Sequence, residues 1–267
     1  MRPVRKAVPN RGQPVVRHLK QVIEDPTFKA AVSLLRQAPI GYQAPKLDLS
    51  QTQPLPDEAL TQRIRWLTER IRAGERILDL GCGRWEMLYF LGRKFPGDHL
   101  GLEREPEFLE RCRHIGVRAI SADFNNPADP ALRFACSQEW DVVLIIDSIV
   151  YWRYPAVVLA ALQDRCKRMF VTVNNAGHLS RRLQLLAGNL DVLPNIRGSI
   201  ADGRIHWSMD WFSNRWTVRG FQIWCEALGF SATPVARRSV TARYLPLGPL
   251  PSLFARSTVF ELTPQSS

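Results

Sequence analysis

The residues best placed for chemistry lie in the segment 75–88, ERILDLGCGRWEML. Asp79 lies at the end of an apolar run, and Gly81 and Gly83 follow before a helical pattern begins. Glycines at such a turn let the backbone bend tightly and let a ligand approach closely. Twenty residues after Gly83, Glu103 ends a second apolar run, where a carboxylate can hold both hydroxyls of a ribose. The spacing therefore predicts a site for a nucleoside-containing ligand.

Two classes of cofactor use this layout. A dinucleotide fingerprint needs a third glycine, and Glu86 stands at that position. A carboxylate at the helix start would face a pyrophosphate, which is an electrostatic objection to a dinucleotide. A loop without a pyrophosphate to bind suits S-adenosylmethionine (SAM), with Asp79 and the glycine backbone facing the amino-acid part of the cofactor.

The elements that must position these residues alternate between strands and helices from residue 57 onward. A helix is expected over 57–72, and Thr217 is expected to open another that ends at Gly229. The expected strands cover residues 76–80, 99–103, 119–122, 141–147, 169–174, 230–237 and 257–262. Alternating β and α units predict an α/β fold, a doubly wound, mostly parallel, seven-stranded sheet of the Rossmann-like type.

Residues 75–103 resemble class I SAM-dependent methyltransferases. The resemblance implies that an acid and its neighbour after the third strand flank the adenine, and Asp123 and Phe124 stand there. It also implies that Asp147, at the end of the fourth strand, lies beside the methyl group, as a cofactor-binding and candidate catalytic residue. Tyr151 and Trp152 follow that strand and are candidates for the pocket wall.

Further downstream, a resemblance is carried by 174–178 (NNAGH), 182–188 (RLQLLAG), Trp207, the helix at 217–230 and 251–255 (PSLFA). These segments resemble the MetW family of methionine-biosynthesis proteins. His178 in this region is a second candidate catalytic residue. Two positions depart from the family pattern, because Trp85 replaces a small residue of the glycine loop and Asn214 stands where a histidine is usual.

Composition divides the chain into two parts. Residues 1–56 form a basic, proline-rich N-terminal extension, with eight prolines and a net charge of +6 out of +11 for the whole chain. Residues 57–267 form the expected SAM-binding, methyltransferase-like domain, in which 174–220 is a substrate-side insertion. The extension could act as a lid over the acceptor pocket, as a structural segment or as an arm for nucleic acid.

The five cysteines are widely spread and no CxxC occurs, so the sequence favours neither a disulfide framework nor a metal site. No apolar run approaches the roughly 18 residues of a membrane span. We therefore expect reduced thiols, no bound metal, no membrane association and a cytoplasmic location.

Three functions remain open from the sequence. The first is a SAM-dependent methyltransferase acting on a small-molecule acceptor. The second, implied by the MetW resemblance, is a non-catalytic SAM-binding partner subunit linked to methionine biosynthesis, with an acyltransferase-like protein as its partner. The third is an RNA methyltransferase that uses the basic arm, although nucleic acid is not the favoured partner.

Overall fold

The fold is described from a computed structural model of the chain. The structure describes residues 21–44, 62–83, 86–187, 198–201, 204–207, 216–238, 244–246 and 250–265.

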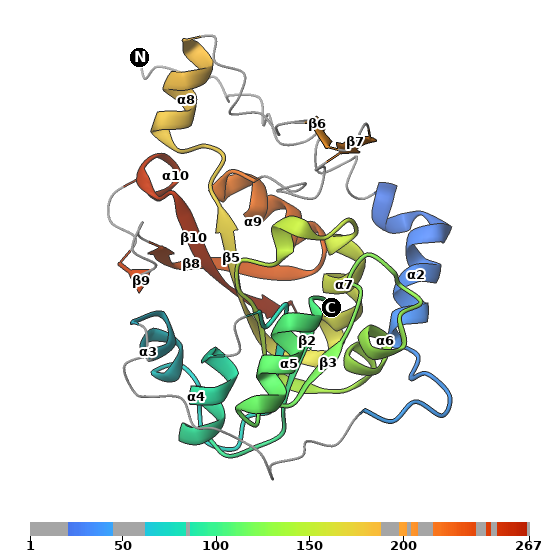
Figure 1. The fold of residues 1–267 in the computed structure, drawn as a ribbon. Coiled ribbons are helices and arrows are strands. Elements are labelled where there is room, and N and C mark those ends of the chain that lie inside the picture. Colours follow the sequence, from blue (N-terminus) through green and yellow to red (C-terminus); the bar gives the residue numbers. More distant parts are fainter. Residues whose placement is uncertain are drawn as a thin grey trace, which may run out of the picture.

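Figure 1 shows a central sheet with helices on both sides. Its eight strands follow the order β3-β2-β1-β4-β5-β10-β8-β9. Strands β1 to β5 are parallel, and β10 runs antiparallel between β5 and β8. The strands are β1 (Ile77–Leu80), β2 (His99–Glu103), β3 (Ala119–Ser121), β4 (Trp140–Ile145), β5 (Cys166–Asn174), β8 (Phe230–Arg238), β9 (Tyr244–Leu245) and β10 (Ser257–Pro264).

The predicted doubly wound, seven-stranded sheet is confirmed, with the two-residue strand β9 added at one edge. Strand β2 has the predicted bounds, and the other long strands differ from prediction by one to three residues at their ends. Strand β4 stops at Ile145, before the predicted end at Asp147, because Asp147 adopts a left-handed backbone conformation with φ 62°. A non-glycine residue in that conformation turns the chain out of the sheet.

Helices cover each face of the sheet with apolar side chains. One face is packed by α3, α4 and α5, and the other by α2, α6, α7 and α9. The helices are α2 (Pro26–Arg36), α3 (Gln62–Thr68), α4 (Glu86–Lys94), α5 (Pro106–His114), α6 (Pro130–Ser137), α7 (Pro155–Leu162), α8 (Leu179–Leu186), α9 (Val218–Ala227) and α10 (Pro251–Phe254). Helix α3 ends at Thr68, four residues before the predicted end.

Helix α2 is the described helix of the N-terminal extension, and it packs on α6 and α7. Asp25 caps its first turn by accepting hydrogen bonds from the backbone of Thr27 and Phe28. Leu35 is fully buried in the same apolar cluster as the strands. Arg36 donates to the carbonyls of Ala160 and Ala161 at 2.7 and 3.2 Å. This part of the extension is therefore joined to the core of the main domain.

The region predicted as an insertion is described in part. It contains α8 and a separate two-stranded sheet of β6 (Gly198–Ala201) and β7 (Arg204–Trp207). Trp216, just before α9, packs against Phe221 and Trp224 with ring centroids 5.4 and 5.2 Å apart. Phe221 belongs to the core, and Trp216 and Trp224 are partly buried against it, in agreement with the helical spacing of Phe221 and Trp224.

Candidate functional site

The glycine loop after β1 is shaped by a close approach from the segment after β4. Gly81 has φ 83°, and a Cβ atom added there would lie 2.5 Å from the Cβ of Ser148. The Ser148 hydroxyl donates to the carbonyl of Leu80 at 2.5 Å and so joins the two segments. Gly83 also has a positive φ, of 49°. The loop thus needs glycine for both its conformation and its packing.

Glu103 closes β2 with its carboxylate turned back toward the glycine loop. One carboxylate oxygen accepts from the amide of Gly83 at 2.7 Å. The other accepts from the amides of Arg104 and Glu105 at 2.7 and 3.0 Å. These bonds fix the orientation of a side chain that is 7% exposed. Glu103 is therefore a preorganised, charged acceptor beside the loop.

Asp79 lies on β1 beneath the loop and is almost fully buried. Neither of its carboxylate oxygens has a hydrogen-bond partner among the described residues. Burial raises the pKa of Asp79 to about 7, while the nearby charge of Arg63 opposes the rise and Glu103 adds to it. A buried carboxylate without donors is costly, so this site is suited to a ligand that brings a donor.

Arg63 of α3 connects the helix before the first strand to the site. Its guanidinium donates to the Asp147 carboxylate at 3.3 Å. Its Nε atom is buried and has no hydrogen-bond partner within the described part of the chain. The positive charge of Arg63 therefore lies near two carboxylates, that of Asp79 on β1 and that of Asp147 just after β4.

The segment after β3 presents Asp123 and Phe124. The Asp123 carboxylate accepts from the amide of Asn125 at 2.9 Å and shapes the turn. The ring of Phe124 stacks on Trp152, with centroids 4.9 Å apart and planes 9° from parallel. One face of Phe124 is therefore covered by protein, and a ligand can reach only its other face or its edge.

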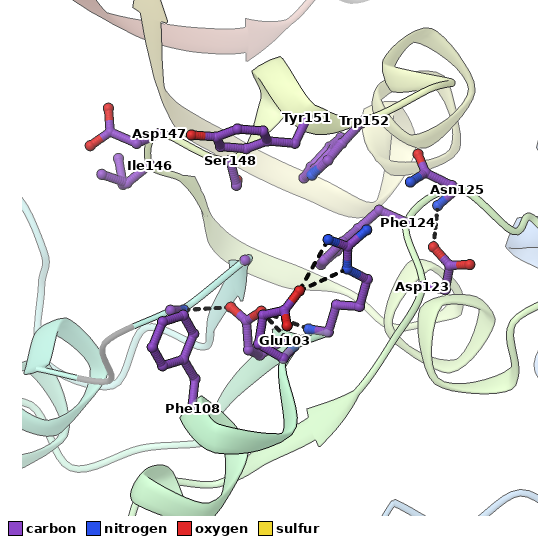
Figure 2. Close-up of a pocket in the computed structure, with 14 residues that line it drawn as sticks. Glu103, Phe108, Asp123, Phe124, Asn125, Ile146, Asp147, Ser148, Tyr151 and Trp152 are labelled. Carbon is purple, nitrogen blue, oxygen red and sulfur yellow. Dashed lines mark hydrogen bonds and ion pairs between the residues drawn. The ribbon is translucent and has the colours of Figure 1, made fainter. Parts of the chain in front are cut away.

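These segments enclose one cavity of about 700 Å³ at the carboxyl ends of the strands (Figure 2). This volume is in the range of sites for drug-sized ligands. Figure 2 shows Glu103 and Phe108 on one side and the segment from Ile146 to Trp152 on the other. The described residues that line it are Gly81, Gly83, Glu103, Arg104, Glu105, Phe108, Asp123, Phe124, Asn125, Ile146, Asp147, Ser148, Tyr151 and Trp152.

Most residues predicted for the site meet at this cavity. Six of the seven cofactor candidates line it, and Asp79 lies beneath the loop. The predicted wall residues Tyr151 and Trp152 line it too. Trp85 and Asn214 lie outside the described residues.

His178 is not brought together with the other candidates. It precedes α8, and its Nδ1 atom accepts from the amide of Ser180 at 3.1 Å. Burial lowers the pKa of His178, and Arg256 lowers it further. The ring is thus used in starting a helix, and it is not among the residues that line the cavity.

Sequence reasoning missed Arg63, Arg104 and Glu105. Arg63 lies on a helix that the sequence reveals through its apolar spacing alone. Its partner Asp147 is 84 positions away, so the sequence gives no sign of their contact. Arg104 and Glu105 directly follow Glu103, so their proximity to the site could have been inferred. Within the described ranges, no group of three or more His, Cys, Asp and Glu residues could hold a metal ion. No helix there is long and apolar enough to cross a membrane.

Comparisons with known proteins agree with this architecture. The protein resembles magnesium protoporphyrin IX methyltransferase of Synechocystis PCC 6803, solved with SAH, the demethylated product of SAM. The TM-score is 0.51 and the identity 12%, over 94% of this chain and 99% of that one. A SAM-dependent methyltransferase of Clostridium acetobutylicum also has TM-score 0.51 and 12% identity, over 77% of this chain and 92% of that one.

A curated relative matches a shorter segment. The ribosomal protein L11 methyltransferase of Cupriavidus pinatubonensis is 34% identical over 65 residues, which are 24% of this chain. The chain therefore spans about a fifth of that relative's length, 22%.

The sheet order, the glycine loop and the acid at the end of β2 define the fold of the class I SAM-dependent methyltransferases. The family described as methionine biosynthesis protein MetW matches residues 62–196, which is half of the chain. The protein belongs to the MetW family.

Proposed function

We propose that the protein is a SAM-dependent methyltransferase that acts on a small-molecule acceptor. The observation that carries the proposal is the fixed carboxylate of Glu103 beside the Gly81–Gly83 loop, at the wall of the cavity. A carboxylate oriented by three backbone amides can accept from both ribose hydroxyls at little further cost in ordering. The similar fold of the methyltransferase that was solved with bound SAH supports the proposal.

The other polar groups match the remaining parts of the cofactor. Asp123, at the turn after β3, would accept from the adenine amine. Asp79 and Arg63 carry opposite charges and each has a buried polar atom without a hydrogen-bond partner among the described residues. The amino-acid tail of SAM carries a partner for each of them, an ammonium that would pair with Asp79 and a carboxylate that would pair with Arg63. The residues present therefore fit SAM.

The main task of the protein in this reaction is to position the two reactants. SAM supplies an activated methyl group, and transfer is an in-line displacement by the acceptor. Holding the reactants in line can contribute a large part of the rate. Asp147, Ser148 and Tyr151 lie on the cavity wall after β4 and would orient the acceptor.

Titration calorimetry with SAM and the variant Glu103→Ala tests the proposal. Removing the carboxylate loses charge-assisted hydrogen bonds worth about 1.5–3 kcal/mol each. We expect SAM affinity to fall at least tenfold. The matched control is Glu107→Ala, because Glu107 is exposed on α5 and pairs with Arg111 outside the cavity. Equal affinities for the two variants and the native protein would contradict the cofactor assignment.

Membership in a family described by methionine biosynthesis favours a second candidate, a SAM-binding partner subunit without turnover. SAH release separates the two. An enzyme forms SAH in proportion to the methylated acceptor, whereas a partner subunit binds SAM, forms no SAH and co-purifies with a protein of that pathway, for which we expect an acyltransferase.

A further inference from the structure

We infer that the methyl acceptor is a cationic amine, received between Asp147 and the aromatic wall of Tyr151 and Trp152. The inference rests on the proposed function and names the substrate class of the same cavity. It is carried by the charge of the cavity and by the side chains on the wall after β4.

The cavity has the opposite charge to the rest of the protein. The chain as a whole carries +11. The cavity lining, among the described residues, holds four carboxylates, Glu103, Glu105, Asp123 and Asp147, and one cation, Arg104. Arg104 is paired with Glu105 at 3.0 Å, so its charge is already balanced. A concave site of one sign concentrates ligands of the other sign and repels phosphates and carboxylates.

Binding of SAM does not cancel this charge. The ammonium and carboxylate of its tail balance each other at Asp79 and Arg63, so the cofactor brings the single positive charge of its sulfonium. Glu103 and Asp123 lie at the ribose and adenine ends of the proposed pose. Asp147 is the carboxylate on the acceptor side, and it is paired with Arg63 at 3.3 Å. With the tail bound, Arg63 is shared between Asp147 and the tail carboxylate, so Asp79, Asp147 and Arg63 together keep one negative charge. The side chain of Asp147 is 30% exposed, so a second ligand can reach it from the cavity.

Aromatic rings complete a binding site for a cation. Tyr151 is 41% exposed and lies on the same wall as Asp147 (Figure 2). Its amide donates to the carbonyl of Ser148 at 3.0 Å, which fixes the turn that carries the ring. Trp152 follows; it is 2% exposed and stacks on Phe124, so it supports the wall from behind while Tyr151 presents the exposed ring. An ammonium near the face of an exposed ring gains about 0.5–2 kcal/mol, in addition to its attraction to a carboxylate.

Methyl transfer to an amine follows from this arrangement. The bound ammonium first gives one proton to water and becomes a neutral amine. Its lone pair then forms the bond to the methyl carbon, while the sulfur–methyl bond breaks and its electron pair stays on sulfur. The nitrogen becomes positive again, so Asp147 stabilises the charge that develops during the step. The products are SAH and a methylammonium ion.

Calorimetry on the SAH-loaded protein at pH 7 tests this inference with two probes of similar shape and opposite charge. Phenethylamine is the cation and 3-phenylpropanoate the anion. We expect phenethylamine to bind at least tenfold more tightly. In Asp147→Asn the preference should disappear. Asparagine tolerates the left-handed conformation of this position, so the backbone should keep its path.

The matched control is Asp164→Asn, the same change at a residue that pairs with Arg36 outside the cavity lining. It should keep the preference for the cation. Tighter binding of 3-phenylpropanoate, an unchanged preference in Asp147→Asn, or displacement of phenethylamine by a short RNA would overturn the amine assignment while SAH still binds. Failure of the native protein to bind SAH would instead overturn the proposed function, and the inference with it.

Discussion

The unpaired carboxylate of Asp79 makes the stability of the protein depend on pH. Burial raises the pKa of Asp79 from 3.8 to about 7. Between these values the folded protein binds more protons than the unfolded chain, so the free energy of unfolding falls as pH rises from about 4 to about 7. The effect is at most about 4 kcal/mol. We expect Asp79→Asn to remove this slope, measured by urea unfolding at several pH values.

The same variant separates stability from binding. Asparagine cannot bind an ammonium as a carboxylate does, so Asp79→Asn should weaken SAM binding even where it stabilises the protein above pH 7. The matched control is Asp164→Asn, because Asp164 is a surface residue that pairs with Arg36 outside the cavity lining. If the free energy of unfolding changes with pH equally in the native protein and in Asp79→Asn, Asp79 does not cause this pH dependence.

Close packing between β2 and the ligand loop explains Gly101. A Cβ atom there would lie 2.7 Å from the sulfur of Cys82 and 2.9 Å from a methyl of Leu88. Overpacking of this kind costs about 1–3 kcal/mol. We expect Gly101→Ala to lower stability and SAM affinity together, because Cys82 stands between the two loop glycines. Thermal melts and calorimetry measure the two effects.

A double variant identifies the cause. If the clash with Cys82 dominates, adding Cys82→Ala should restore part of the stability lost in Gly101→Ala. Gly92→Ala is the matched control. Gly92 lies within helix α4, and a Cβ atom there would meet His99 at an ordinary van der Waals distance of 3.5 Å. It should be neutral or stabilising. No recovery in the double variant would exclude Cys82 as the group that Gly101 accommodates.

Much of the fold could be predicted because alternating apolar runs and helical spacing are local signals. Strand β2 was predicted to the residue, since Glu103 is a charged end to an apolar run. The end of β4 was placed two residues too late, because the apolar run continues through Ile146 while the chain turns at Asp147. Arg63 could not be predicted, because only the folded chain brings it to Asp147.

At the scale of the whole molecule, helix α2 of the basic extension contributes to the core. Its contribution to stability can be measured. Leu35 of α2 is fully buried, and the carbonyl of its neighbour Leu34 accepts from Arg133 at 3.1 Å. Truncating a buried leucine to alanine costs about 2–5 kcal/mol. We expect Leu35→Ala to lower the free energy of unfolding by that amount, in one cooperative transition shared with the sheet. The exposed Ser33→Ala is the control and should be nearly neutral.

The same variant tests how the extension relates to the cavity. None of residues 21–44 lines it, so a structural role for α2 predicts that Leu35→Ala keeps its SAM affinity at temperatures where it remains folded. A lid would give the opposite pattern, with stability preserved and turnover lost. A separate, earlier unfolding transition in Leu35→Ala would show that α2 is not part of the cooperative core, because a helix that unfolds alone does not share the stability of the sheet.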